Sequence, residues 1–488
     1  MNKTILTGLL VLATALSCTR TYDVIVVGGG AGGTMAAIEA SRDGALTLIV
    51  EEGPWLGGML TSAGVSAIDG NYRLRGGLFG EFTDSLAARY GGYEALKSGW
   101  VSNILYNPAV GAEVLQNMAA EAGVHIRTRN QVTRIKKRWA SGWTVTLGSG
   151  IRYHARVLID GTELGDVALE AGCEALQDRV SAQDLTYVAI VKEYDHDVLM
   201  EQPEGYDREL YRDCCVNWSP EMMLSYGLLP DGHWMLNWPA SGNDYFAEYL
   251  DMEAEERAEV VRKAKLRTLG YLYFLQHELG YSRLGIADDV FPTEDGLPLI
   301  PYWREARRIA GRDTMTVEAA RRPYDFDLYT RAIAVGDYPV DHHHNQNPRR
   351  EELSALACGQ IPSFSVPLGV LIPVSVDDFL VADKAVSVSW EMNGATRLQP
   401  VVMGMGQAAG ALAALAAKSR LSPSEIPATL VQEVLLDHSC YLLPFLDLKP
   451  SDPGFRELQE AGIRGEVRGT GRSVGWANET WVNLPEDE

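Results

Sequence analysis

Residues 22–58 of the chain, YDVIVVGGGAGGTMAAIEASRDGALTLIVEEGPWLGG, decide its fold. The β-branched run at 23–27 is typical of a strand that is buried on both faces. A glycine turn follows at once, residues 34–42 are rich in helix formers, and residues 46–50 form a second apolar run. This order of strand, turn, helix and strand predicts a Rossmann-like unit and therefore an α/β protein.

The glycine turn contains the pattern G-x-G-x-x-G, which is typical of dinucleotide binding. Gly28 permits the tight turn, Gly30 lets the backbone approach a pyrophosphate, and Gly33 lets the helix and strand pack closely. The helix N-terminus offers N–H groups and a partial positive charge to the phosphates. Glu51 follows about twenty residues later, where an acid is expected to bind ribose hydroxyls. The candidate cofactor-binding residues of this unit are Gly28, Gly30, Ala31, Gly32, Gly33, Glu51 and Glu52.

A glycine-rich loop can also merely turn a chain. Here the flanking strands, the helix and the terminal acid all agree with the binding motif, so a dinucleotide site is the favoured interpretation. The motif alone does not distinguish FAD from NAD.

The composition indicates a globular protein with more than one domain. The chain has 488 residues, of which 46% are hydrophobic, and a chain of this length usually divides into two domains. Its formal net charge is -22. Such a surface repels nucleic acid and anionic lipid headgroups, so no nucleic-acid partner is predicted.

Residues 1–18 resemble a signal peptide. Lys3 supplies a positive start, residues 5–16 are apolar, and the segment closes with Ala15-Leu16-Ser17-Cys18. The ending resembles the lipobox of bacterial lipoproteins, although Ala15 stands where leucine is commonest. We therefore expect export to the cell envelope as a lipoprotein that is membrane-anchored at Cys18, with a plain periplasmic or secreted protein as the alternative. No other stretch is predicted to span a membrane.

Five cysteines remain after the leader: Cys173, Cys214, Cys215, Cys358 and Cys440. No C-x-x-C motif is present, so neither a thioredoxin-like dithiol nor an iron–sulfur cluster is predicted. The adjacent pair could be redox-active, but two packed thiols are favoured because neighbouring cysteines rarely form a disulfide. No metal site is predicted.

Further along the chain, strand-like and helix-like segments alternate. A helix is predicted at 112–122, paired strands at 132–137 and 143–147, and a final strand at 153–159 that delivers Gly161 at its carboxyl end. A ligand is expected at such an edge of a parallel sheet.

The middle of the chain has a different composition. It contains a strand-like run at 185–191, a charged helix at 253–267 and many tyrosines and tryptophans, which indicate an inserted α+β substrate domain. A buried strand at 378–383 and a small-residue helix at 401–417 follow. The predicted organisation is a leader (1–18), an FAD-binding domain in two parts (19–177 and 361–430), a substrate domain (178–360) and a C-terminal extension (431–488).

The assignment to FAD comes from a resemblance to a known family. The opening unit with Gly57-Gly58-Met59, the segment VLIDGT at 157–162 and the segment at 397–410 resemble FAD-dependent oxidoreductases of the glutathione-reductase-like class. The segments PYWREARRI at 301–309 and GDYPVDH at 336–342 are similar to the branch of that class related to heterodisulfide reductase, which has secreted bacterial members. The resemblance implies non-covalent FAD in a discontinuous Rossmann-like domain.

The same resemblance implies roles for individual residues. The motif glycines would hold the pyrophosphate and Glu51 the adenosine ribose. Iron–sulfur clusters of some relatives require clustered cysteines, which are missing from this sequence, so no cluster is implied. The further candidate cofactor-binding residues are Gly57, Gly58 and Met59 along the pyrophosphate and ribityl chain, Val132 at the adenine, Gly161 near the adenosine diphosphate, and Gly404 and Gln407 near the ribityl–isoalloxazine end.

Candidate catalytic residues follow from the chemistry of a flavin. FAD accepts hydride at N5, so a protein group must remove the accompanying proton. His342 and His344 are candidate bases, because the pKa of histidine lies near neutrality and alternate residues of an extended segment share a face. The alternative interpretation is that these histidines lie in a surface loop and have no catalytic role.

Arg304, with Arg307 and Arg308, could bind an anionic substrate, while pairing with acids such as Glu305 is the alternative. The sequence thus predicts an FAD-dependent oxidoreductase that moves hydride between flavin N5 and a small substrate, for which it suggests a carbohydrate-derived compound. The electron acceptor is not indicated. The alternatives are an electron-transfer subunit that works with a protein partner and a flavin-fold binding protein without chemistry.

Overall fold

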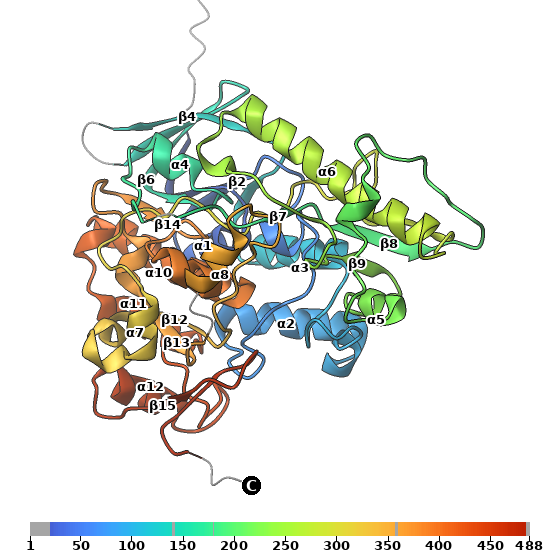
Figure 1. The fold of residues 1–488 in the computed structure, drawn as a ribbon. Coiled ribbons are helices and arrows are strands. Elements are labelled where there is room, and N and C mark those ends of the chain that lie inside the picture. Colours follow the sequence, from blue (N-terminus) through green and yellow to red (C-terminus); the bar gives the residue numbers. More distant parts are fainter. Residues whose placement is uncertain (1–19, 139–141, 179, 357–359, 485–488) are drawn as a thin grey trace, which may run out of the picture.

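The computed structural model describes residues 20–138, 142–178, 180–356 and 360–484 (Figure 1). The expected leader with Cys18, and Cys358, lie outside the described residues. The opening unit consists of β1 (Arg20–Val27), α1 (Ala31–Arg42) and β2 (Thr47–Val50). The two strands are parallel, with Val24 opposite Thr47. The α/β prediction is confirmed, and α1 begins three residues earlier than expected because the glycine turn runs directly into it.

A seven-stranded sheet forms the centre of the protein. Its path is β3-β2-β1-β6-β5-β4, and β14 also pairs with β6. One edge of β6 is divided, since its first half pairs antiparallel with β5 and its last three residues pair parallel with β14. The expected pairing of 132–137 with 143–147 is confirmed and is antiparallel. The further strands of the sheet are β3 (His125–Arg127), β4 (Val132–Lys137), β5 (Trp143–Leu147), β6 (Arg152–Asp160) and β14 (Phe379–Val381).

The helix α10 (Gln399–Ser419) packs directly on α1. A Cβ added at Gly406 would lie 2.2 Å from the carbonyl oxygen of Gly32, and one at Gly410 would lie 2.4 Å from that of Ala36. Glycine is therefore required for this contact. By length and composition α10 could also cross a membrane, contrary to the expectation that no segment after the leader could. However, 83% of its most apolar stretch is buried inside the protein.

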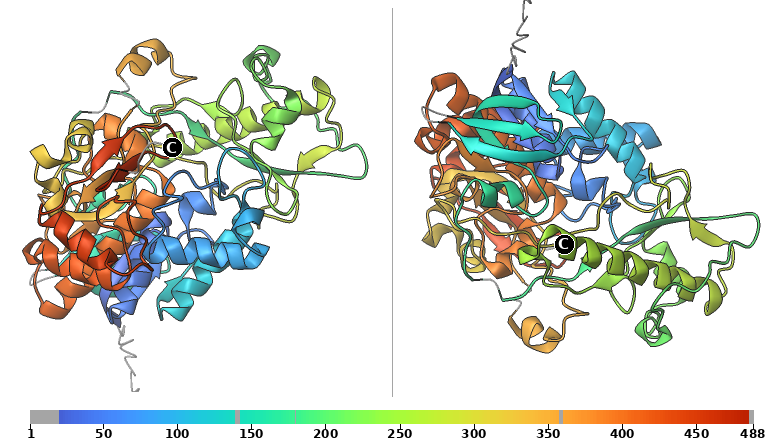
Figure 2. Two further views of the ribbon diagram at one scale, coloured as in Figure 1. Left: turned by 90° about the horizontal axis from the view of Figure 1, so that it is seen from below. Right: turned by 90° about the horizontal axis from the view of Figure 1, so that it is seen from above.

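A second hydrophobic cluster surrounds α6 (Ala254–His277). The helix starts with a capping box formed by Glu253 and Glu256 and runs ten residues beyond the expected end at 267. The run at 185–191 forms two strands instead of one, because β7 (Leu185–Thr186) pairs with β10 (Asp244–Tyr245) whereas β8 (Ala189–Glu193) lies between β9 (Trp234–Leu236) and β11 (Leu284–Ile286). Figure 2 shows this green part beside the blue and orange parts that contain β1 and α10.

The remaining elements cover the sheet or form the C-terminal part of the chain. The further helices are α2 (Gly77–Tyr90), α3 (Pro108–Glu121), α4 (Asp166–Glu170), α5 (Pro220–Ser225), α7 (Val317–Arg321), α8 (Arg350–Leu356), α9 (Trp390–Thr396), α11 (Ala428–Asp437) and α12 (Phe455–Ile463). The further strands are β12 (Ala332–Gly336), β13 (Phe364–Pro367), β15 (Thr470–Arg472) and β16 (Glu479–Trp481). The 3-10 helix η1 (Gly58–Leu60) follows the opening unit.

Candidate cofactor and active site

The three motif glycines lie against the carboxyl end of β6. A Cβ at Gly28 would lie 2.5 Å from the backbone nitrogen of Thr162, and one at Gly30 would lie 2.6 Å from the carbonyl oxygen of Gly161. At Gly33 it would lie 2.2 Å from the carbonyl oxygen of Gly28. None of the three motif glycines can carry a side chain, so their backbone lines the approach to the N-terminus of α1, where an anion is stabilised best.

Glu51 follows the last residue of β2 and lies beside the same loop. Its Oε2 accepts a hydrogen bond from the backbone N–H of Gly29 at 2.6 Å, and its Oε1 accepts one from Gly53 at 2.6 Å. Burial raises the pKa of Glu51, and these two N–H groups oppose that rise. An ionised carboxylate has further lone pairs, so Glu51 can still accept hydrogen bonds from hydroxyl groups. Glu52 is exposed.

The second glycine turn lies directly on the first. The N–H of Gly57 donates to the carbonyl oxygen of Gly29 at 2.7 Å, and a Cβ at Gly58 would lie 2.8 Å from the Cα of Gly30. The N–H of Met59 donates to Oε1 of Glu163 at 3.1 Å. The structure thus brings together the two turns that the sequence marked separately.

A buried ion cluster that the sequence analysis missed joins these segments. The Lys384 ammonium contacts the Glu163 carboxylate and lies 3.2 Å from Oδ1 of Asp383. Oδ2 of Asp383 accepts a hydrogen bond from the N–H of Gly32 at 2.9 Å. The Lys384, Asp383 and Glu163 side chains are 0%, 1% and 14% exposed. We call this set the lysine cluster; its only sequence signal was an acid–base pair at the end of a buried strand.

The other predicted cofactor residues lie in several places. Val132 is the first residue of β4, and Gly161 packs on the motif glycines. The Gln407 amide accepts a hydrogen bond from the N–H of Leu78 at 2.9 Å and donates to Glu39 at 3.1 Å. A Cβ at Gly404 would lie 3.1 Å from Ala334. The observed partners of Gly404 and Gln407 are protein groups of α2, α1 and β12, and their contact with a flavin stays a prediction.

A chain of ions connects the segment after β12 with β10, with the loop that carries Arg304 and with Arg397 at the end of α9. Arg304 pairs with Asp244 at 3.1 Å, and Nδ1 of His343 lies 2.9 Å from the other oxygen of Asp244. Nε2 of His343 lies 3.3 Å from Oδ2 of Asp341, which is 3.0 Å from Arg397. Arg304, Asp244 and Arg397 are buried, whereas Asp341 keeps 29% and His343 17% of its side chain accessible. The chain of ions therefore presents Asp341 and His343 to solvent.

The pKa values of these groups follow from their pairing. Burial would raise the pKa of Asp244, but Arg304 and His343 outweigh it and lower the pKa to about 2. Burial would likewise raise the pKa of Asp341, yet His343 and Arg397 hold it well below its usual range. The pKa of His343 is raised, because the two carboxylates outweigh burial and the charge of Arg304. The two carboxylates thus favour the protonated form of His343.

Asp69 is a further carboxyl group at this site, and no motif marked it in the sequence. It lies in the loop after η1, where its backbone N–H donates to Oε1 of Gln399 at 3.2 Å. Burial and the charge of Asp341 raise the pKa of Asp69 to about 7, against the opposing effect of Arg397. Two neighbouring carboxyl groups thus have widely separated pKa values, an arrangement that is common at acid–base sites.

The predicted bases His342 and His344 contact each other. Nε2 of His342 lies 3.0 Å from the carbonyl oxygen of Glu391, and Nδ1 of His342 lies 3.2 Å from Nε2 of His344. A carbonyl only accepts, so we assign the proton of His342 to Nε2 and that of His344 to its own Nε2. Nδ1 of His344 is then a buried acceptor with no protein partner among the described residues. Burial lowers the pKa of His342 to about 3 and that of His344 to about 4, so both rings are neutral.

The arginines that were candidates for an anion clamp pair with separate acids. Arg307 contacts Asp166 and Arg308 contacts Asp178, while Arg304 belongs to the chain of ions described above. The three side chains are therefore not directed at one common ligand. Pairing with acids was the alternative left open by the sequence, and the partners are aspartates.

Glu39, Asp43 and His438 place potential metal ligands within 4.8 Å of one another. Nδ1 of His438 lies 2.6 Å from Glu39, and this hydrogen bond is the largest of the effects that raise the pKa of His438. The hydrogen bond between His438 and Glu39 is enough to explain why these side chains lie together, and no bound ion is needed. The adjacent cysteines Cys214 and Cys215 are free, with their sulfurs 3.3 Å apart, as expected for packed thiols.

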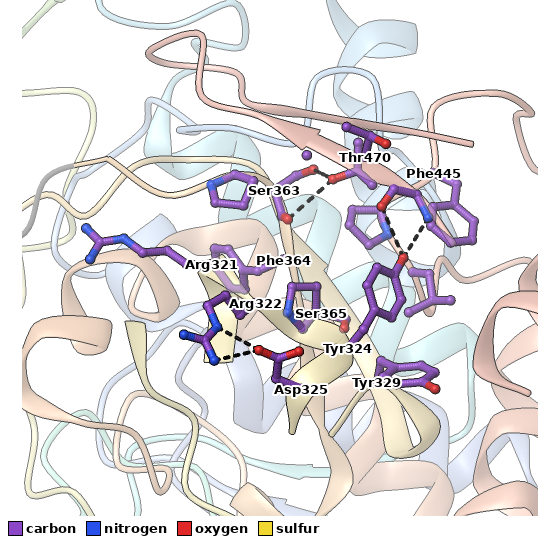
Figure 3. Close-up of a pocket in the computed structure, with 17 residues that line it drawn as sticks. Arg321, Arg322, Tyr324, Asp325, Tyr329, Ser363, Phe364, Ser365, Phe445 and Thr470 are labelled. Atoms are coloured by element: carbon purple, nitrogen blue, oxygen red, sulfur yellow. Dashed lines mark hydrogen bonds and ion pairs between the residues drawn. The ribbon is translucent and has the colours of Figure 1, made fainter. Parts of the chain in front are cut away.

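A cavity of about 330 Å³ lies in the C-terminal part of the chain, between the segment after α7 and the β15–β16 hairpin (Figure 3). The Tyr324 hydroxyl accepts a hydrogen bond from the N–H of Gly469 at 2.6 Å, and the hydroxyls of Ser363 and Thr480 are 2.6 Å apart. These polar groups of the wall are thus paired with each other. None of the predicted site residues lines this cavity, so it is separate from the cofactor site.

Comparisons with known proteins give a family match over most of the chain and one curated relative. A family model described as FAD dependent oxidoreductase matches residues 23–435. The NADH:fumarate oxidoreductase of Klebsiella pneumoniae (strain 342) is 37% identical over 100 residues, which are 20% of this chain and 10% of that protein. The chain thus spans about a tenth of the length of this curated relative.

Solved structures give more distant matches. OxyS anhydrotetracycline hydroxylase from Streptomyces rimosus is 15% identical, with 91% of this chain and 73% of that chain covered and a TM-score of 0.36. A variant of NikD, an unusual amino acid oxidase essential for nikkomycin biosynthesis, is 17% identical, with 38% and 60% covered and a TM-score of 0.25.

Proposed function

Because this chain belongs to the family of FAD-dependent oxidoreductases, we propose that it oxidises or reduces a small, carbohydrate-derived substrate that residues 178–360 help to hold. FAD is its cofactor, and when bound it supplies a hydride acceptor or donor at N5. The contribution of the chain itself is to bind the cofactor, to orient the substrate and to move the accompanying proton.

The glycine-rich site fits FAD on the observations made above. The three motif glycines admit no Cβ, α1 begins at this loop, and the Glu51 carboxylate lies beside it. Gly28, Gly30 and Gly33 would hold the pyrophosphate and Glu51 the ribose. Lys384 offsets one of the two carboxylates of the lysine cluster, which reduces their repulsion of a bound anion.

The accessible pair formed by Asp341 and His343 is the observation that carries the proposed substrate class. Both ring nitrogens of His343 already contact Asp244 and Asp341, whereas the Asp341 carboxylate keeps further lone pairs and can accept hydrogen bonds from hydroxyl groups. Arg304 and Arg397 already pair with Asp244 and Asp341, so neither is an unpaired cation that would select an anionic substrate. Neutral, hydroxyl-rich molecules such as sugars match this set of groups.

Anaerobic reduction of the bound flavin tests the proposal. The purified holoprotein is mixed with neutral sugars, and the flavin absorbance is followed. Bleaching by a sugar supports the oxidoreductase. Reduction only by a protein partner would favour the electron-transfer role instead, and protein that takes up no FAD would contradict both.

We also propose that the chain is exported and anchored through a lipid on Cys18. The support is the order of charged, apolar and small residues before that cysteine. Metabolic labelling with a radioactive fatty acid tests this, with Cys18→Ser as the matched control. A labelled wild type and an unlabelled variant are expected, and an unlabelled wild type would leave a plain signal peptide.

A further inference from the structure

A cavity of about 470 Å³ lies beside α6, in the middle part of the chain. Residues 262–267 of α6 form one wall, and residues 204–211 form a second. The strand β10 with Phe246, and the segment that follows the three histidines, complete it. None of the predicted cofactor or catalytic residues lines this cavity. Its volume lies within the range of small-molecule sites, which is about 300–1,000 Å³.

Much of the wall is aromatic or aliphatic. The rings of Tyr206 and Tyr211 are stacked, with their centroids 5.8 Å apart and their planes inclined by 10°. The further apolar side chains that line the cavity are Leu210, Tyr245, Phe246 and Leu266. Removing apolar surface from water is the main gain when a ligand enters such a site, and aromatic rings pack well on one another. The wall therefore favours a ligand with a flat, apolar body.

Arg267 brings a buried positive charge to this apolar wall. The residue is 8% exposed, and no ion pair of it is found among the described residues. Its Nε donates to the carbonyl oxygen of Gly242 at 2.8 Å and its Nη2 to that of Leu210 at 3.2 Å, while Cζ lies 4.5 Å from the ring centroid of Tyr211. Nη1 has no hydrogen bond within the described chain and is not fully buried. A guanidinium stays charged in proteins, so Arg267 presents unused N–H groups to the cavity.

The other cations of the wall already have anionic partners. Nε of Arg262 lies 2.8 Å from Oε2 of Glu259, and its Nη1 lies 3.1 Å from Glu204. Nζ of Lys263 lies 3.6 Å from Oε1 of Glu259. Both cationic side chains are about half exposed, so water also screens their charge. Among the described residues, Arg267 is thus the lining cation that lacks a counter-ion.

Two carboxylates act on Arg267 from beyond ion-pair distance. Burial lowers the pKa of Arg267, and the charges of Asp244 and Asp207 are among the effects that oppose this. The two oxygens of Asp244 lie 3.1 Å from Arg304 and 2.9 Å from His343, which offset its charge. Asp207 is exposed, so water screens it. A further negative charge can therefore be placed beside Arg267 without strong repulsion.

We propose that this cavity is a binding site for a small aromatic carboxylate. The carboxylate pairs with Arg267, because N–H groups on the two terminal nitrogens of a guanidinium match the two oxygens of a carboxylate. The ring of the ligand packs against the aromatic wall around Tyr206 and Tyr211. This site is separate from the accessible Asp341 carboxylate, and it does not depend on the proposed reaction.

Calorimetric titration of the purified holoprotein with three probes tests the ligand class. trans-Cinnamate carries both the ring and the charge, trans-cinnamamide carries the ring without the charge, and acetate carries the charge without the ring. trans-Cinnamate should bind saturably at one site per chain. The amide should bind at least about tenfold more weakly, because it forms no charge-assisted hydrogen bond with Arg267. Acetate should also bind at least about tenfold more weakly, because it buries no ring.

Arg267→Met is the matched variant, and it should retain FAD. It should weaken the binding of trans-cinnamate at least about tenfold and leave that of trans-cinnamamide within about twofold. A variant that only disturbed the fold would weaken both. Arg262→Met is the control, since Arg262 lines the same cavity but is paired and half exposed; both affinities should stay within about twofold of the wild type.

Leu266→Trp tests the cavity independently of the charge, and it replaces Arg267→Met if that variant does not fold. Leu266 is half-buried on α6 and lines the cavity, so a larger ring at this position should fill the space and abolish the binding of both cinnamate probes. Wild-type protein that does not bind trans-cinnamate, or binds it no more tightly than the amide, would overturn the proposal. Binding of trans-cinnamate that survives Leu266→Trp unchanged would also overturn it, because the ligand would then lie elsewhere.

Discussion

Replacing Lys384 by methionine tests whether the lysine cluster holds the cofactor site together. The substitution keeps the length of the side chain and leaves the Glu163 and Asp383 carboxylates without their cation. Since the Lys384 side chain is 0% and that of Asp383 1% exposed, water cannot replace the lost partner. Removal of one member of a buried ion pair lowers the free energy of unfolding by about 3–5 kcal/mol. We expect a loss of this size at pH 7.

The loss should depend on pH with a definite sign. Burial already raises the pKa of Glu163, and Lys384 opposes that rise. Without the ammonium the folded-state pKa rises further, so a proton binds the folded state more tightly than the unfolded one. Stability is then present at low pH and is lost as pH rises above about 4.3, the unfolded value, through the folded pKa. The deficit of Lys384→Met should therefore be larger at pH 8 than at pH 5.

Urea unfolding followed by tryptophan fluorescence and by FAD release measures both effects. The excess negative charge near the N-terminus of α1 should also weaken FAD binding at least tenfold, which corresponds to about 1.4 kcal/mol. The double variant Lys384→Met/Glu163→Gln removes one charge of each sign and should recover more than half of the loss. Lys418→Met, at an exposed position of α10, should stay within about 0.5 kcal/mol of the wild type. A single variant within about 1 kcal/mol of the wild type, or a double variant no better than the single one, would refute the reasoning.

Three further predictions concern the neighbouring residues. A Cβ at Gly32 would lie 1.5 Å from the carbonyl oxygen of Ala382, so Gly32→Ala should lower stability by about 3 kcal/mol in thermal or urea unfolding, and a change below about 1 kcal/mol would contradict the packing of α1. Glu51→Gln leaves one of two backbone N–H groups without its acceptor, so the Kd for FAD should rise about tenfold in a fluorescence titration, and an unchanged Kd would exclude Glu51 from the site. Both ring nitrogens of His342 are used in hydrogen bonds to Glu391 and His344, so His342→Ala should leave FAD bound and the rate of anaerobic flavin reduction nearly unchanged. A large loss of rate would return this residue to the catalytic candidates.

The fold was predictable because its signals are local. Residues 22–58 contain a β-branched run, a glycine turn and a second apolar run in this order, which predicts a strand–turn–helix–strand unit. Similar local patterns identified β6, β14 and α10. The division of 185–191 into β7 and β8 was not predictable, since each half pairs with a different distant strand and periodicity does not report partners. The extra length of α6 depends on burial against the second hydrophobic cluster, which is likewise a tertiary effect.

The site was predictable only where one stretch of chain makes it. The motif glycines and Glu51 follow each other within one unit, so spacing alone indicated them. The lysine cluster joins the ends of β6 and β14, and Asp69 becomes a neighbour of Asp341 only through the packing of separate segments. A single acid such as Asp69, next to a glycine, has the sequence signature of an ordinary turn. Its unusual environment exists only in the folded chain.

The packing of α10 on α1 has a consequence for the order in which the protein folds. The hydrogen bond between Gln407 and Glu39 joins residues 368 positions apart, and the glycines beside it are the contact surface of the two helices. A ribosome therefore completes most of the chain before the first helix meets its partner, and closing so long a loop is slow. Until then the apolar face of α1 is open to chaperones and to aggregation. We therefore expect FAD uptake to be a late event of biogenesis, and a chain that ends before α10 should remain without cofactor.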